Sequence, residues 1–312
     1  MRDARVIGLA WVALSACGTH AATMVGDAGD AATLVDGDVL PPVGDANTTG
    51  CADDAKLVYV VSTQNDLWRF NPGTLAFTKV GTLDCPTTST PESMAIDRSA
   101  RAYVAMMDGN LFQVDTATAH CAATGYTLEQ SQRKIFDLSF SRTSATSETL
   151  FTSTTCCWSN GGVTVTNQGG GGLATLAVPS LKLALVGDYT GALAGYPAAL
   201  AGTGDGRLFG MFPNVNQADG GAAPMLAQID ETTGATSAPI VLSSAVQSGS
   251  AFAFSFWGGD FWFYAGKSGG QSSTVTRFRY STDKSYSMVI ADTGMTIIGA
   301  GVSTCAPLVA PN

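Results

Sequence analysis

Two carboxylates, Glu92 and Asp137, are the residues of this chain best placed to do chemistry. Glu92 directly precedes S-M-A-I-D and Asp137 lies in F-D-L-S-F-S, and both segments have the small and apolar residues of a buried strand. Two carboxylates that flank a glycosidic bond suffice for its hydrolysis, so this pair is the candidate for a carbohydrate-active site. No spacing motif links the two, and the sequence predicts no catalytic residue beyond them.

Nucleophilic, metal and cofactor chemistry have little support in the residue inventory. The chain has two histidines, and neither His20, near the N-terminus, nor His120, at a turn, is placed as a central general base. G-K-S-G-G from Gly266 matches G-x-S-x-G and contains the G-K-S of a phosphate loop, yet a strand-like segment follows it instead of a helix. We expect a loop there, and no metal ion or cofactor.

Polar aspartates and amides mark the turns and loops. Five aspartates fall at strand ends and hairpin turns, where Asp caps local backbone amides: Asp97, Asp115, Asp205, Asp230 and Asp260. A second set, which we call the loop rim, combines an indole with amides: Trp158, Asn160, Asn167, Gln168, Asn214, Asn216 and Gln217. An aromatic ring beside amides suits a sugar or peptide ligand. The same residues are also common in loops that bind nothing.

The composition indicates short buried strands and an acidic surface. Charged residues make up 13% of the chain and hydrophobic residues 45%, with 36 glycines. The 25 acidic and 16 basic residues give a net charge of -9 and a pI near 4.5. Such a surface repels phosphate backbones and anionic lipids, so we expect no nucleic-acid binding. The expected partner is a glycan, a peptide or an envelope protein, bound by a monomer.

The N-terminal residues predict export and lipid anchoring. Residues 1–16 combine two arginines with an apolar run too short to span a bilayer, as in a signal peptide. Leu14-Ser15-Ala16-Cys17 resembles a bacterial lipobox, which makes Cys17 the lipidated residue and predicts an outer-membrane or extracellular lipoprotein. The alternative is an ordinary signal peptide followed by an incidental cysteine. Residues 17–50 are rich in aspartate without a sustained period, so we expect a disordered acidic tether.

A repeated strand-and-turn pattern predicts the fold of residues 51–307, with 308–312 as a tail. Five segments alternate apolar and polar residues into a turn rich in Asn, Asp, Pro, Gly or Thr, and they begin at Leu67, Leu111, Leu173, Leu226 and Val275. With the strands around them, they describe four-stranded units of an all-β, five-bladed β-propeller. The alternative is a ring of six or seven blades, with a degenerate blade hidden in residues 155–196.

The chain end is predicted to close this ring. The first unit lacks an inner strand, and Ile297–Thr304 at the other end of the chain has the required pattern. Pairing of these segments brings Cys51 close to Cys305, so we expect a disulfide between them. Export favours disulfides among the remaining cysteines, with Cys85 and Cys121 as the default pair. Cys156 and Cys157 either bond to each other or to cysteines elsewhere.

Several motifs together resemble a known kind of protein. They are P-E-S-M-A-I-D-R from Pro91, D-G-N-L-F-Q-V-D from Asp108, G-T-G-D-G-R-L-F-G from Gly202, F-W-G-G-D-F from Phe256 and the terminal G-A-G-V-S-T-C-A-P from Gly299. On these segments the chain resembles a family of bacterial secreted lipoproteins with a predicted β-propeller domain. The resemblance covers about residues 58–307 and implies no particular activity.

Long loops give the functional expectation. Those between the second and third strands are short in the first two blades and long in the last three, and they belong to the end of the propeller where inner strands begin. Because binding residues concentrate on loops held by a rigid scaffold, we expect a non-catalytic binding module. The alternatives are a carbohydrate-active enzyme that uses Glu92 and Asp137 in the central channel, and a structural ring with no ligand.

Overall fold

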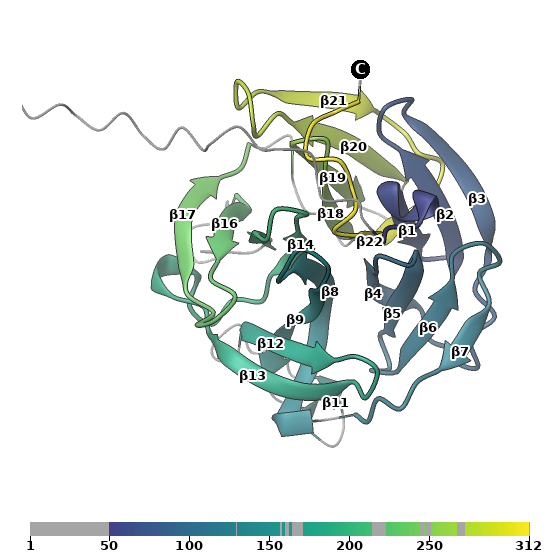
Figure 1. Ribbon diagram of the computed structural model, residues 1–312, viewed down its shortest axis with the longest axis vertical. Helices are drawn as coiled ribbons and strands as arrows, with labels where there is room; N and C mark the ends of the chain where they lie inside the picture. The colour runs from purple at the N-terminus through teal and green to yellow at the C-terminus, as the bar shows by residue number, and fades with distance from the viewer. Residues whose placement is uncertain are drawn as a thin grey trace, which may run out of the picture. The chain divides into compact units, whose positions relative to one another are not determined.

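The protein is an all-β propeller of five four-stranded antiparallel sheets around a common axis (Figure 1). The computed structural model describes residues 50–128, 130–156, 158–159, 162–163, 171–213, 223–243, 246, 251–266 and 272–311. The five sheets confirm the prediction of five blades. Within the described ranges, no helix is both long and apolar enough to cross a membrane.

Each blade has its strands in order from the axis outward, and the innermost strand is given first here. Blade one has β22 (Ile297–Val302), β1 (Val58–Ser62), β2 (Asp66–Asn71) and β3 (Ala76–Thr82). Blade two has β4 (Pro91–Ile96), β5 (Arg101–Met106), β6 (Leu111–Asp115) and β7 (Cys121–Ala123). Blade three has β8 (Arg133–Arg142), β9 (Glu148–Cys156), β12 (Gly172–Ala177) and β13 (Lys182–Asp188).

The last two blades repeat this order. Blade four has β14 (Ala199–Gly202), β15 (Leu208–Phe212), β16 (Met225–Ile229) and β17 (Thr236–Val241). Blade five has β18 (Phe252–Trp257), β19 (Asp260–Gly266), β20 (Ser273–Phe278) and β21 (Tyr286–Ile290). The remaining elements are the short hairpin β10 (Trp158–Ser159) and β11 (Gly162–Val163), and the 3-10 turns η1 (Asp53–Lys56), η2 (Gln130–Gln132) and η3 (Gly191–Leu193).

Residues 155–196 do not form the extra blade of the alternative prediction. Their described part supplies the end of β9, the β10–β11 hairpin, both outer strands of blade three and η3. The strands β12 and β13 pair with β9 in a single sheet. The long spacing in this part of the repeat is therefore an insertion within blade three.

The hydrophobic core lies between neighbouring blades, in five clusters that each join two sheets. Between blades four and five, for example, Phe209 packs edge-on against Phe261 with ring centroids 5.0 Å apart. Between blades one and five, Phe70 makes the same kind of contact with Trp262 at 5.8 Å. Because both faces of a blade are covered by its neighbours, second strands such as β1 and β15 are buried along their whole length.

Small residues are required where the inner strands converge. A Cβ added at Gly202 of β14 would lie 2.0 Å from the carbonyl oxygen of Phe140 on β8. One added at Gly301 of β22 would lie 3.1 Å from the carbonyl oxygen of Met94 on β4. The alanine- and glycine-rich inner strands seen in the sequence are therefore a consequence of crowding at the axis.

Inner-strand amides that face a neighbouring blade are bonded by side chains from that blade. The hydroxyl of Ser93 on β4 accepts from the Leu138 amide on β8 at 2.9 Å. In the same way, Ser139 on β8 accepts from the Gly202 amide on β14 at 2.7 Å. These bonds satisfy strand-edge donors that would otherwise be buried without partners.

The chain end closes the ring as predicted. β22 pairs antiparallel with β1, with Val302 opposite Val58. Cys305 is bonded to Cys51, with 5.9 Å between their Cα atoms, and Cys85 is bonded to Cys121. Both predicted disulfides are thus confirmed, and the first closes a loop with a sequence separation of 254.

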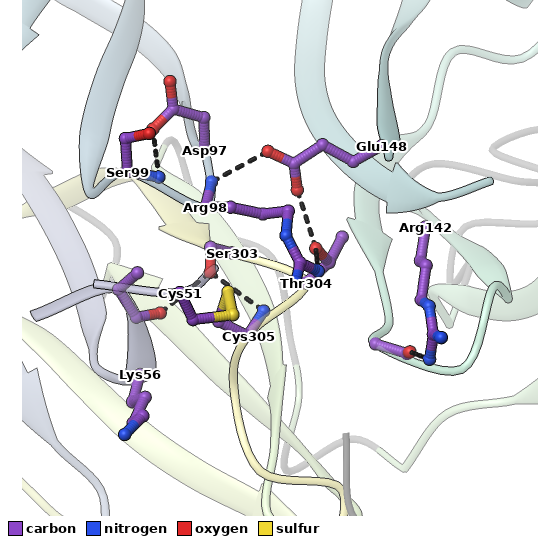
Figure 2. The surroundings of a disulfide bond; sticks show 12 residues. Cys51, Lys56, Asp97, Arg98, Ser99, Arg142, Glu148, Ser303, Thr304 and Cys305 are labelled. Carbon is purple, nitrogen blue, oxygen red and sulfur yellow. Dashed lines mark hydrogen bonds between the residues drawn. A yellow bond between two sulfur atoms is a disulfide. The ribbon is translucent and has the colours of Figure 1, made fainter. Parts of the chain in front are cut away.

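A hydrogen-bonded cluster surrounds the closing disulfide (Figure 2). The carboxylate of Glu148, at the start of β9, accepts from the Arg98 amide at 2.8 Å and from the Thr304 hydroxyl at 2.7 Å. The Arg98 guanidinium donates to the same Thr304 hydroxyl at 3.3 Å. Ser303 donates to the carbonyl of Ala55 at 2.9 Å. Blades one, two and three are therefore joined at the end of the axis where inner strands finish, which we call the channel exit.

Candidate functional site

A cavity of about 130 Å³ lies on the propeller axis at the opposite end, where the inner strands begin. Inner strands of all five blades contribute to its wall, together with one residue of the β5–β6 loop. The described lining residues are Glu92, Met107, Phe136, Asp137, Ala199, Phe252, Ala253, Phe254, Ile298 and Ala300. We call this cavity and its lining the channel mouth. Its only polar side chains among these residues are two carboxylates.

Glu92, the second residue of β4, is held by an ion pair with blade three. The ammonium of Lys134 on β8 lies 3.0 and 2.7 Å from the two carboxylate oxygens. Both side chains are mostly buried, with 14% of Lys134 and 16% of Glu92 exposed. Burial raises the pKa of Glu92, and the neighbouring ammonium opposes this effect. The pair therefore holds a carboxylate at the cavity that is already matched by a positive charge.

Asp137 joins three blades at the same place. One carboxylate oxygen accepts from the Ser93 hydroxyl of blade two, and the other accepts from the Leu200 amide of blade four at 2.5 Å. Like Ser93 and Ser139, it accepts from an inner-strand amide of the next blade. Enclosure between these strands raises the pKa of Asp137 to about 7, although both hydrogen bonds oppose the shift. Unlike a serine, this side chain changes its charge near neutral pH.

Two aromatic rings from non-neighbouring blades meet over this end of the axis. Phe136 of β8 and Phe252 of β18 have ring centroids 6.4 Å apart with planes inclined at 38°. Both residues are partly exposed. Met107, with 48% of its surface exposed, forms the outer edge of the cavity. The channel mouth therefore combines an apolar wall with carboxylates, as small-molecule sites commonly do.

The cavity is small compared with typical ligand sites, which enclose about 300–1,000 Å³. Its described lining therefore encloses the end of a ligand more readily than a whole sugar ring. Within the described residues, a longer ligand would extend past Met107 toward solvent.

A second hollow lies over blade two and η1, with a volume of about 580 Å³. It is lined mostly by polar and charged residues, including Asp54, Arg101, Gln113 and Asp115. Asp54 already pairs with Arg69 at 3.1 Å, and Asp115 accepts from the amides of its own turn. This open polar groove has no phenylalanine, tyrosine or tryptophan in its described lining, so it is the weaker site for an apolar ligand.

The structure brings the two predicted carboxylates, Glu92 and Asp137, into one cavity. The loop rim cannot be compared with its prediction, because its side chains lie outside the described residues. They are those of Trp158, Asn160, Asn167, Gln168, Asn214, Asn216 and Gln217. Cys17 and residues 267–270 also lie outside the described residues. The strands that precede the three long loops nevertheless end at the channel mouth, because Cys156, Met211 and Ala265 pair with the first residues of inner strands.

Other predicted residues have structural roles. On an exposed surface, Nδ1–H of His120 donates to the Asp84 carboxylate at 2.7 Å, and this carboxylate raises the pKa of His120. Three of the turn aspartates cap backbone amides as predicted: Asp97, Asp115 and Asp230. The other two, Asp205 and Asp260, form ion pairs with Arg207 and Arg277.

Sequence reasoning missed Lys134, Phe136 and Phe252 as site residues. Each lies at the start of an inner strand, which is the same signal that singled out Glu92 and Asp137. If every side chain at the start of an inner strand had been considered, and not only the carboxylates, these three residues would have been identified.

Comparisons with known proteins give this chain neither a family nor a function. No family model and no curated protein sequence matches the chain. The chain is similar to a gluconolactonase from Xanthomonas campestris, with 14% identity over 76% of this chain and 72% of that chain and a TM-score of 0.45. It is also similar to the Dos1 propeller, with 11% identity over 82% and 72% and a TM-score of 0.42.

A third solved structure is the PQQ-bound aldose sugar dehydrogenase from Streptomyces coelicolor. It has 11% identity over 78% of this chain and 81% of that chain, with a TM-score of 0.40. Similarity at this level carries no inference about ligand or reaction.

Proposed function

We propose that the chain is a non-catalytic binding module of the bacterial cell envelope, which takes the end of a glycan, peptide or protein partner at the channel mouth. The observation that carries this proposal is the cavity on the axis where Glu92 and Asp137 meet the rings of Phe136 and Phe252. An apolar wall with a few oriented polar groups supplies both contact area and direction. The loop rim belongs to the proposed surface as a sequence prediction.

The contacts of the two carboxylates favour binding over catalysis. Glu92 is engaged by Lys134, and both oxygens of Asp137 accept hydrogen bonds from neighbouring blades. A hydrolytic pair must instead reach the leaving group and the attacking water or sugar carbon. A cavity of about 130 Å³ is also small for a site that must hold a sugar ring between the two groups.

A carbohydrate-active enzyme is the second candidate, and one observation favours it. The pKa of Asp137 is raised to about 7 in a cavity that also contains Glu92. A carboxylic acid that titrates near the working pH is suited to general acid or base catalysis. This candidate predicts glycoside hydrolysis that is lost in both Glu92→Gln and Asp137→Asn.

Location in the envelope rests on the N-terminal sequence and on the cysteine chemistry. The lipobox-like segment ends at Cys17, and the two disulfides of the propeller favour an oxidising compartment. Palmitate labelling should reach the wild-type chain and not Cys17→Ser, and only the wild type should remain in the membrane fraction. Equal labelling of both would remove lipid anchoring from the proposal.

The proposed site is tested with a glycan and peptide screen, followed by titration of each hit. Phe136→Ala and Phe252→Ala should each weaken binding by at least tenfold, because the apolar wall is lost. Arg101→Ala, in the polar groove over blade two, is the matched control and should bind as the wild type does. Loss of binding in Arg101→Ala with full binding in both phenylalanine variants would transfer the site to the groove.

A deletion separates the loop rim from the cavity. Shortening residues 157–170, which follow the last paired residue of β9, should leave folding intact and abolish binding if the rim makes the main contacts. If binding survives this deletion and is lost on replacing Glu92 or Asp137, the cavity alone is the site. Catalytic turnover in the wild type that both carboxylate variants lose would instead establish the enzyme.

A further inference from the structure

The polar groups of the channel mouth define the ligand that complements them. Glu92 and Asp137 are the only polar side chains in its described lining, and an ionised carboxylate accepts hydrogen bonds without donating any. The other eight lining residues are apolar. We infer that the channel mouth recognises a primary ammonium group on a short alkyl chain, of the kind at the end of a lysine side chain. This inference rests on the binding function proposed above and names its ligand class.

The protein itself places an ammonium group at this site. Nζ of Lys134 contacts both oxygens of Glu92 and is only 14% exposed. A largely buried ammonium is costly unless it is paired, so the local carboxylates stabilise this group. Asp137 accepts two hydrogen bonds, and an ionised carboxylate has about four acceptor positions. It therefore retains acceptor capacity for a ligand.

The volume of the cavity favours a slim ligand end. At about 130 Å³ it is small for a small-molecule site. An ammonium group on a short alkyl chain is slimmer than the planar guanidinium of an arginine side chain. The rest of a longer ligand would leave past the exposed Met107.

The aromatic rings fit both parts of such a ligand. Phe136 and Phe252 provide apolar area for methylene groups, and aromatic faces attract an ammonium within about 6 Å. An anionic ligand has no cationic partner in the described lining, and the one ammonium beside it, Lys134, is already paired with Glu92. A neutral alcohol would satisfy the acceptors without using their charge, so it is the matched comparison.

Two sources share this chemistry, a free amine and a lysine side chain of a partner protein. The experiment uses the full chain in detergent micelles, with carbon-13 in the methionine methyl groups. The Met107 signal is assigned with Met107→Leu and reports on the cavity directly. Titrations use n-butylammonium and n-butanol at pH 8, where Asp137 is mostly ionised.

The expected result is a saturable shift of the Met107 signal, with n-butylammonium binding at least tenfold more tightly than n-butanol. Asp137→Asn should weaken n-butylammonium about tenfold and leave n-butanol unchanged. Lys134→Met removes the competing internal ammonium from Glu92 and should strengthen n-butylammonium binding. Arg101→Ala should leave every titration unchanged. Opposite effects of Asp137→Asn and Lys134→Met cannot come from a general loss of structure.

A second titration distinguishes the sources. The blocked peptide Gly-Lys-Gly is compared with its Nε-acetyllysine form. Tighter binding of the lysine peptide than of n-butylammonium identifies a partner lysine, and binding of n-butylammonium alone identifies a free amine.

The outcomes separate this inference from the proposed function. Equal affinity for n-butanol and n-butylammonium, with no effect of Asp137→Asn, would overturn the ammonium inference and keep the channel mouth as a binding site. A screen ligand that has no amine and shifts the Met107 signal would likewise overturn the ammonium inference and keep the channel mouth as a binding site. If no probe and no screen ligand shifts Met107, both the inference and the proposed site are wrong.

Discussion

The two ends of the propeller axis use carboxylates in different ways. At the channel exit, the two oxygens of Glu148 accept from Arg98 and Thr304, which belong to blade two and to the chain end. At the channel mouth, Glu92 and Asp137 also have protein partners, yet they line a cavity with aromatic walls. At the exit, the Glu148 carboxylate is fully used in bonds between blades where the ring closes. At the mouth, the two carboxylates border an open cavity.

This difference separates stability from binding along one axis. The exit must keep the first and last strands of the ring together, because the ring opens if β22 leaves β1. The mouth lies at the beginning of the inner strands, where strand ends and loops provide side chains that the ring does not need for closure. We therefore expect substitutions at the exit to lower the free energy of unfolding and substitutions at the mouth to alter binding and its pH dependence.

The largest effect is expected at the exit, from removing the Cys51–Cys305 disulfide. Replacing both cysteines by serine should lower the free energy of unfolding by about 5 kcal/mol in the chain-entropy model, because the closed loop is nearly as long as the domain. Urea unfolding followed by tryptophan fluorescence measures the change. The matched control replaces Cys85 and Cys121, whose sequence separation is 36, and should cost about 2 kcal/mol less. Equal losses would contradict the special role of the closure.

At the mouth, the next effect is on pH dependence. Folding raises the pKa of Asp137 from an ordinary value of 3.8 to about 7, so the folded protein binds an additional proton between these pH values. Stability should therefore decrease as the pH rises from 4 to 7, with this residue contributing a slope of at most about 1.4 kcal/mol per pH unit.

Asp137→Asn tests that slope. The variant should show a weaker pH dependence between pH 4 and 7 and no loss of stability at pH 8, where the wild type has an ionised carboxylate. The charged groups nearest to Asp137 are Glu92 and its partner Lys134, and they are unchanged in this variant. Urea titrations at each pH measure the slope. Identical slopes for both proteins would show that Asp137 does not titrate in this range.

A matched substitution at the exit should behave in the opposite way. Glu148→Gln replaces one of the two acceptor oxygens by an NH2 donor, so either the Arg98 amide or the Thr304 hydroxyl loses its acceptor, and an unsatisfied buried group costs about 1–3 kcal/mol. We expect a loss of that size at pH 8 by urea unfolding, where Asp137→Asn shows none. A larger loss in Asp137→Asn would reverse the assignment of stability to the exit.

The smallest effect on stability is expected from Phe252→Leu at the mouth. The ring is partly exposed, and a substitution that keeps much of its apolar volume should change the free energy of unfolding by less than about 1.5 kcal/mol. Binding of the screen ligand should nevertheless weaken. Phe256→Leu, on the same strand and 2% exposed, is the control and should cost more stability with little effect on binding. The reverse pattern would place the ligand elsewhere.

The sequence by itself determined the architecture of the propeller. Alternation of apolar and polar residues at five sites predicted five blades, and the missing first strand predicted that Ile297–Thr304 closes blade one. These features are readable because side-chain alternation in a strand and the residues of a turn are local properties. The Cys51–Cys305 disulfide was predicted from the closure of the ring, and the Cys85–Cys121 disulfide from the expected export to an oxidising compartment. Glu92 and Asp137 were found because inner-strand starts could be recognised in the sequence.

Only the tertiary structure decided what these carboxylates contact. Lys134 reaches Glu92 from the next blade, and Phe136 meets Phe252 from a blade that is not its neighbour. Such contacts depend on the angle between blades and on how far each inner strand extends along the axis, and no local pattern encodes either quantity. The cavity exists because five strand starts converge with small residues such as Ala199 and Ala300 between the large ones. Convergence at an axis is a property of the closed ring, so it appears only when all five blades are in place.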